Sequence, residues 1–346
     1  MLKTYINAIT LFFSIFFQSS IGTAQSIRPI RDDVGYCWKM DEMTKLIDYL
    51  GKIETDKRVG NIIAGISPHD DYLYAAKVYY PLYRSLKAKE VLIFGVTHGT
   101  VRKEIGDQQN ILIFDDFNEW IGPFKNIQIS PLREFIKSRL DTPYFSVNNK
   151  AHTLEHSIEG QLPFLQFFNP DIKITPIMVT AMPFERMEEV SEKLSLIISE
   201  YICSKNLVIG KDIVFLISSD ANHYGTDFSN IPFGEDSLAH WKATEQDKRI
   251  AKDYLSEVVQ PEKIKIFTDE MKNVVWCGKF SIPFGLLTTE KVVKKVLNKN
   301  LTGELLRYSD TFTEGVLPVK GTQMGITAPF SLKHWCGFLS AAFYAE

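Results

Sequence analysis

The sequence has few cysteines and no excess of basic residues. Its 346 residues include four cysteines, too few for a scaffold built on disulfides, although one bridge could form in an exported protein. None has the C-x-x-C spacing of a zinc ribbon. The formal net charge is −3 and the pI is about 6.2, so we expect no nucleic-acid partner. Internal repeats and low-complexity linkers are also lacking, which favours one large domain. The cysteines are Cys37, Cys203, Cys277 and Cys336.

Beyond the first 25 residues, no apolar run reaches the roughly 20 residues that a membrane span requires. The amino-terminal segment has the features of an export signal: Lys3 is positive, residues 6–17 are mostly apolar, and residues 22–24 are small. We therefore expect residues 1–24 to be a cleaved signal peptide and the protein to be secreted or periplasmic, with no stable membrane span after cleavage. Amino-terminal sequencing of exported protein should begin at or near Gln25, whereas an intact amino terminus would indicate an uncleaved anchor.

The segment KAHTLEHSIEGQLPFL contains His152, Glu155 and His156 in the H-x-x-E-H pattern of one class of zinc peptidases. In that class both histidines lie on one helix face and bind zinc, while the glutamate activates water. Pro163 would end or kink such a helix after about two turns, which is short for a rigid metal platform. The alternative is an irregular loop followed by a helix that starts near Pro163.

Short apolar runs alternate along the chain with longer helical patterns. The runs are rich in β-branched and aliphatic residues, as buried strands are. This alternation predicts an α/β fold with a mixed or mostly parallel central sheet flanked by helices. The basic run at 291–299 is interpreted as the solvated side of the last predicted helix. The predicted strands are 61–67, 90–96, 110–114, 172–179 and 212–218, and the predicted helices are 72–86, 131–140, 184–203 and 281–297.

A histidine follows the end of three predicted strands: His69, His98 and His223. Ligands of open α/β sheets bind at the carboxyl edge, where these loops converge. A lone histidine there is more often a hydrogen-bonded structural residue, but three at equivalent strand ends indicate a site. Imidazoles from separate strands can share a metal ion while neighbouring polar groups fix their tautomers.

Three aspartates stand beside these histidines: Asp70, Asp71 and Asp220. They could bind the metal or orient the imidazoles. For Asp70 and Asp71 the alternative is turn and helix-start chemistry, which aspartate favours.

Five segments, in this order, resemble the signature blocks of the MEMO family, also called AmmeMemoRadiSam system protein B: ISPHDDYLYAA, VLIFGVTHG, EHSIEGQLPFL, ISSDANHYG and WCGKFSIPFGLL. They extend from about Gly60 to Leu287. The resemblance implies a single MEMO-like α/β domain over residues 25–346, similar to class III extradiol (LigB-like) dioxygenases, which hold non-haem iron with two histidines and a carboxylate. It also argues against a zinc peptidase, because EHSIE is a family block and His152 lies outside it.

The resemblance further implies a metal site of two histidines and a cysteine. Fe(II) is the favoured metal and copper the alternative. A histidine of the SSD-x-x-H block would act as acid and base, with an aspartate and a third histidine beside it. By position, the metal ligands are His69, His98 and Cys277, and the residues beside them are His223, Asp220 and His156.

The chain departs from the family pattern at two places. Pro68-His69-Asp70-Asp71-Tyr72 stands where the family usually has P-H-A-G-Y, which adds two acidic side chains next to a ligand. The early H-A-G-S-W-Y block appears here as DDVGYCW, without its histidine. An export signal is also unusual beside cytosolic family members.

Two classes of function follow from these observations. The first is an Fe(II)-dependent, dioxygenase-like oxidoreductase that acts on an unknown small chelating substrate. The second is a non-catalytic module that binds metal or a peptide in the same pocket. A thiolate from Cys277 favours the second, because it suits copper as well as iron and is itself oxidisable. Without the resemblance, the favoured interpretation of Cys277 is a small buried hydrophobe or half of a disulfide.

Overall fold

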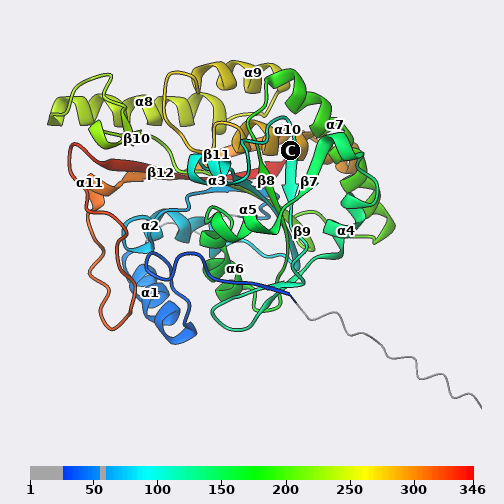
Figure 1. Cartoon of the computed structure of the whole chain (residues 1–346), viewed down its shortest axis with the longest axis horizontal. Helices are drawn as coiled ribbons and strands as arrows, with labels where there is room; N and C mark the ends of the chain where they lie inside the picture. Colours follow the sequence, from blue (N-terminus) through cyan, green and yellow to red (C-terminus); the bar gives the residue numbers. More distant parts are fainter. Residues whose placement is uncertain (1–25, 55–59) are drawn as a thin grey trace, which may run out of the picture.

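The computed structural model describes residues 26–54 and 60–346 (Figure 1). The predicted signal peptide, residues 1–24, lies outside the described residues. Within the described ranges, no helix combines the length and the apolar character needed to cross a membrane.

A parallel core of four strands organises the molecule. Its members are adjacent in the order β8 (Lys173–Val179), β3 (Glu90–Val96), β9 (Ile213–Ser218) and β2 (Ala64–Ser67). All pairs among them are parallel, and nearly every residue is buried. This burial explains why the sequence presents continuous apolar runs here without the alternation of a half-exposed strand. The predicted strands in these four regions are confirmed.

Within the described residues, further strands, some parallel and some antiparallel, extend the core to a mixed sheet of 12 strands, which confirms the predicted fold class. A long carboxy-terminal hairpin, which the sequence analysis did not predict, adds β12 (Trp335–Ala345) to β2 and β11 (Leu301–Asp310) to β12. The remaining strands are short: β1 (Ile27–Arg28), β4 (Leu112–Phe114), β5 (Glu119–Trp120), β6 (Ile127–Ile129), β7 (Phe145–Val147) and β10 (His223–Tyr224).

Helices cover both faces of the sheet, so that the core has two layers (Figure 1). Along β3, Leu92 and Phe94 pack into one layer, whereas Val91 and Ile93 pack into the other, as the two-residue period of a strand requires. One layer is completed by α4 (Pro131–Lys137), α7 (Phe184–Ser204), α8 (Ser237–Leu255), α9 (Pro261–Glu270) and α10 (Ser281–Leu297), and the other by α1 (Met40–Ile53), α2 (Tyr72–Tyr83), α3 (Gly99–Glu104), α5 (Asn149–Leu154) and α6 (Leu162–Phe168).

The predicted helices are present, and α10 has the predicted bounds. Its basic end is solvated as predicted, because Val292 and Val293 are buried while Lys294 and Lys295 are exposed. All four cysteines are free thiols, and Cys203 is the exposed one.

Candidate metal centre

The register of the parallel strands brings the predicted site residues together. Ser67 at the end of β2 pairs with Ser218 at the end of β9. His69 and Asp220 each stand two residues after these serines, so both lie at the same edge of the sheet. His98 follows β3 on the neighbouring strand. The rings of His69 and His98 lie edge to face with centroids 5.1 Å apart.

The tautomer of His69 is set by the serine at the end of β9. The Ser218 hydroxyl donates its only proton to the carbonyl of Ser157 at 2.6 Å, so its oxygen must accept the proton of His69 Nδ1 at 2.8 Å. The Nε2 lone pair of His69 is therefore free to bind a cation. His69 is 1% exposed, and burial, together with the nearby histidines, holds its pKa well below the ordinary value.

Glu155 orients His98 in the same way. One carboxylate oxygen accepts from His98 Nδ1 at 2.8 Å and the other from the His98 backbone N–H at 3.0 Å. The backbone N–H groups of His156 and Ser157 also donate to this carboxylate. Burial opposes ionisation of Glu155, but His98 and these hydrogen bonds hold its pKa well below the ordinary value. For His98, burial lowers the pKa and the Glu155 carboxylate raises it, with a net increase. Because Glu155 holds Nδ1 of His98, Nε2 is the nitrogen that can bind a metal once its proton is lost.

His156 lies against both of these histidines. Its ring stacks on His98 with centroids 4.7 Å apart and planes 8° apart, and it meets the His69 ring edge-on at 5.4 Å. Burial and the neighbouring His98 lower the pKa of His156 to about 4. The His156 imidazole is therefore neutral at neutral pH, and its unprotonated nitrogen can bind a metal.

Cys277 approaches the cluster from the segment before α10. Its Sγ lies 3.4 Å from His69 Nε2 and accepts from the backbone N–H of Asp220 at 3.0 Å. Gly278 makes this approach possible, because a Cβ there would lie 2.2 Å from Ser219 Oγ. Burial and the Asp220 carboxylate raise the pKa of the Cys277 thiol well above its ordinary value. A bound cation would reverse this effect and stabilise the thiolate.

Asp220 contacts His69 through both carboxylate oxygens. Oδ1 accepts the His69 backbone N–H at 2.9 Å, and Oδ2 lies 3.3 Å from His69 Nε2. Burial raises the pKa of Asp220 to about 7. Asp220 can therefore orient His69 or serve as a carboxylate ligand.

Two groups of side chains in the described residues have ligand atoms within 4.8 Å of one another. The first is His69, His98 and His156, and the second is His69, Asp220 and Cys277. The predicted ligands His69, His98 and Cys277 are thus divided between two groups that share His69. The described residues therefore contain two sets of side chains that could hold a metal ion.

His223 stands at one side of this centre, in the strand β10. Its Nδ1 proton goes to the carbonyl of Ala221 at 3.2 Å, which leaves the Nε2 lone pair unused. Burial and His98 lower the pKa of His223 to about 4. A cavity of about 210 Å³ is lined by His223, His98 and Cys277 among others, so these three side chains face one small space.

The H-x-x-E-H pattern does not form the helical platform of a zinc peptidase. Helix α5 ends at Leu154, before Glu155 and His156, and α6 begins at Leu162 with Pro163 in its first turn. His152 donates from Nε2 to the Ile113 carbonyl at 3.0 Å and belongs to neither group of candidate ligands.

Asp70 and Asp71 are in neither group of candidate ligands. Asp70 Oδ1 accepts the backbone N–H of Asp71 at 2.6 Å, which is local turn chemistry. Asp71 precedes α2 without capping it, and its carboxylate instead accepts the Thr327 backbone N–H at 2.5 Å. The acidic pair therefore organises loops next to the centre.

The roles of Glu155, Ser218 and Tyr36 were not predicted from the sequence. The Tyr36 hydroxyl, from the altered early block, donates to the His69 carbonyl. Ser218 and Glu155 fix the two imidazoles, as described above. Ser218 and Glu155 both lie in segments that resemble family blocks, ISSDANHYG and EHSIEGQLPFL. The sequence does not indicate which histidine each of them contacts, because these contacts arise only in the folded chain.

Replacing Glu155 with glutamine is expected to weaken metal binding by roughly 10- to 100-fold, the usual effect of losing a partner that orients a ligand. Both carboxylate oxygens of Glu155 accept hydrogen bonds from N–H groups. In the glutamine variant one of these oxygens becomes an NH2 group, which cannot accept a hydrogen bond from the N–H that it faces. We also expect the free energy of unfolding to fall by about 1–3 kcal/mol. Competition with a chelating dye measures the first effect and urea unfolding the second. Glu189→Gln, at an exposed residue paired with Arg186, is the control, and equal losses in both variants would contradict the assigned role.

Comparison with known proteins agrees with this architecture. A family model described as Memo-like protein matches residues 35–315. The chain is 31% identical to a MEMO1 family protein of Saccharolobus solfataricus over 66% of this chain and 72% of the relative. It is 27% identical to one of Pyrococcus horikoshii over 72% and 81% of the two chains, and 30% identical to one of Metallosphaera sedula over 66% and 72%. The chain belongs to the Memo family.

Proposed function

We propose that this chain is an exported metal-binding protein with one ion held by His69, His98 and Cys277, and that it acts as a dioxygenase-like oxidoreductase on a small ligand. The observation that carries the proposal is the position of His69. Its Nε2 carries the lone pair of the ring and lies 3.4 Å from Cys277 Sγ, and His69 belongs to both groups of candidate ligands. Fe(II) is the favoured metal, and copper is the alternative.

The chemistry of the donors supports a transition metal over calcium or magnesium. Two imidazole nitrogens and a sulfur suit iron, copper or zinc, whereas Ca²⁺ and Mg²⁺ prefer oxygen ligands. Ser218 and Glu155 hold the two imidazoles in the tautomers that a metal requires. A small shift of Cys277 toward His98 would bring all three proposed ligands around one ion. His156 or Asp220 could take the place of one of these ligands.

Bound Fe(II) would supply the redox chemistry for a reaction with dioxygen. The chain itself would position the ligand and move its proton. His223 directs Nε2, its unprotonated nitrogen, at the 210 Å³ cavity and can accept a proton from a hydroxyl group held within hydrogen-bond reach. His156, stacked on His98, and Asp220, next to His69, would hold these imidazoles in place beside the cavity. We propose a small molecule or a peptide as the ligand and no nucleic-acid partner.

A second candidate function is metal binding without catalysis. Cys277 favours it, because a thiolate binds Cu(I) well and is vulnerable to oxidation by the reaction that it would host. In this case the protein would hold copper, or present the pocket to a peptide, outside the cytoplasm.

Metal content after anaerobic purification tests the proposal. We expect about one equivalent of iron or copper per chain and, for the iron-loaded protein, oxygen consumption with some member of a panel of catechols. Metal without oxygen consumption would favour the second candidate. Absence of tight binding for iron, copper and zinc would contradict both.

A further inference from the structure

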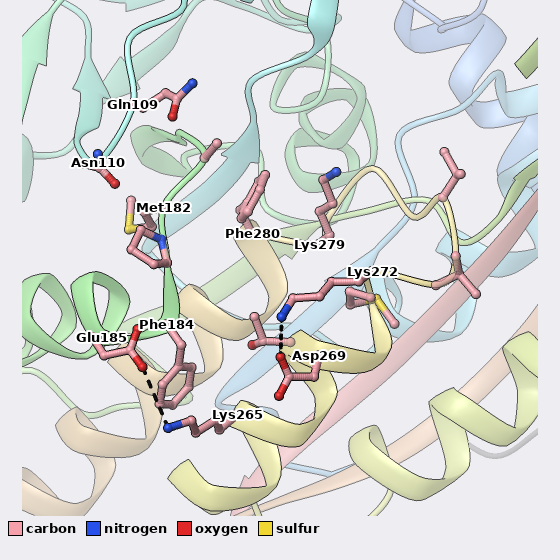
Figure 2. A pocket seen from close by; sticks show the side chains of 16 residues that line it. Gln109, Asn110, Met182, Phe184, Glu185, Lys265, Asp269, Lys272, Lys279 and Phe280 are labelled. Carbon is pink, nitrogen blue, oxygen red and sulfur yellow. Dashed lines mark hydrogen bonds and ion pairs between the residues drawn. The ribbon is translucent and has the colours of Figure 1, made fainter. Parts of the chain in front are cut away.

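Figure 2 shows the lining of a groove of about 600 Å³. This groove neighbours the cavity at the candidate metal centre. It is formed by the start of α7, by α9 and by residues 271–280, which lead to α10. Val275 and Lys279 line both this groove and the 210 Å³ cavity at the centre. The two spaces are therefore neighbours, and Cys277 lies on the segment between their shared residues.

Apolar side chains form one part of the groove lining, next to polar ones such as Gln109 and Asn110. Met182 and Phe184 approach from the end of β8 and the start of α7, and Phe280 approaches from the opposite segment (Figure 2). Met271 and Val274, which also line it, are almost fully buried. This apolar part of the groove favours an aromatic or aliphatic group over a polar one.

Three lysines line the groove, and two of them are already paired. Lys265 lies 3.7 Å from Glu185, and Lys272 lies 2.6 Å from Asp269, as the dashed lines in Figure 2 indicate. Lys279 has no carboxylate partner within residues 26–54 and 60–346. Its ammonium group instead lies over the Phe280 ring, 5.3 Å from the centroid.

We propose that this groove binds the substrate of the metal centre, and that the substrate is an organic acid with a bulky apolar group. The apolar group would occupy the groove, and the carboxylate would pair with Lys279 at the junction of the two spaces. The reacting part would then reach the cavity lined by His98, His223 and Cys277. The assignment as a substrate site rests on the proposed function, whereas binding to the groove does not.

The combined shape and charge favour such an acid over a neutral apolar molecule. The cavity at the centre is small, so a larger ligand must extend into the groove. The Lys279 ammonium would attract a negative charge to the junction. Lys265 and Lys272 are already paired with carboxylates, so they contribute little to the binding of an anion. A neutral ligand would fill the groove but leave Lys279 without a partner.

The test compares 4-phenylbutyrate with 4-phenylbutanamide, which has the same shape without the charge. Titration of the metal-free full chain, followed by NMR, should give a threefold to fivefold tighter dissociation constant for the acid, roughly the effect of an exposed ion pair. Lys279→Met should remove this difference, whereas Lys272→Met should retain it. Equal affinities of acid and amide for the parent chain, or a difference that survives Lys279→Met, would overturn the proposal.

Filling the groove provides a second test. Thr268 lines it from α9, and Thr268→Trp should abolish binding of both ligands while the far-ultraviolet circular dichroism remains that of the parent. Unchanged binding in this folded variant would place the ligands elsewhere and overturn the proposal.

A paramagnetic probe separates this proposal from the proposed function. In the Co(II)-loaded chain, the methylene protons next to the carboxylate should relax faster than the ring protons, relative to a Zn(II)-loaded control. Bound Co(II) without this pattern would overturn the link between groove and centre. Failure of Co(II) and Zn(II) to bind at all would overturn the proposed function, while binding of the acid to the metal-free chain would be measured independently.

Discussion

Replacing His69 with alanine is expected to remove the metal almost completely. His69 is the one residue common to both groups of candidate ligands, so its loss leaves neither group intact. The effect should exceed the roughly 10- to 100-fold loss caused by removing an outer partner. The measurement is metal content after anaerobic purification, together with affinity from competition with a chelator.

His152→Ala is the matched control for this experiment. His152 and His69 are both 1% exposed, so either substitution removes a buried imidazole from a similarly packed place. His152 donates to the Ile113 carbonyl and lies outside the candidate ligands, so this variant should keep its metal despite some loss of stability. Retention of metal by His69→Ala, or equal depletion in both variants, would contradict the assigned centre.

Substitutions of Cys277 examine the third ligand in the same assay. Cys277→Ala should lose metal. Cys277→Asp supplies the carboxylate of a two-histidine, one-carboxylate site, so it should retain Fe(II) and lose much of its Cu(I) affinity. If both variants bind metal as the parent does, Cys277 is not a ligand, and the centre is formed by His69 and His98 with His156 or Asp220.

His223→Ala is expected to lower turnover by roughly two to four orders of magnitude, the usual contribution of a general acid or base. Metal content should stay near that of the parent, because His223 belongs to neither group of candidate ligands. Its Nε2 is the unused nitrogen facing the small cavity, and alanine cannot replace it. Oxygen consumption by the iron-loaded chain, with a catechol that the parent consumes, measures the change.

His334→Ala serves as the control for this variant. The ring of His334 contacts Phe228, whose ring also contacts His223, and His334 pairs with Asp227 at 3.1 Å. Its removal should change turnover by much less. Loss of metal together with activity in His223→Ala would make His223 a ligand, and unchanged turnover would remove it from the mechanism.

The parallel core was predictable because it is buried on both faces. Strands such as β3 need apolar side chains on both faces, and this produces the continuous run EVLIFGV. The hairpin of β11 and β12 was not predicted. Five residues of β11, including Leu305, Leu306 and Arg307, are only half-buried, and Gly303 interrupts the strand pattern, so its pairing with β12 depends on distant contacts.

For the candidate centre, the sequence by itself determined which residues of metal-binding type follow buried strands. His69, His98 and Asp220 each stand two residues past a strand end, and the parallel arrangement of the strands then requires them to share one edge. Family resemblance added Cys277, which no strand pattern indicates.

Only the tertiary structure decided which nitrogen each histidine presents and which residues hold it. Ser218 fixes His69 across 149 residues of sequence, and Cys277 reaches His69 across 208. A local pattern cannot encode such contacts, because they depend on strand register and on how closely loops such as the one at Gly278 approach each other. The same limit applies to the groove beside Lys279, which exists only because the start of α7, α9 and the segment before α10 meet in the folded chain.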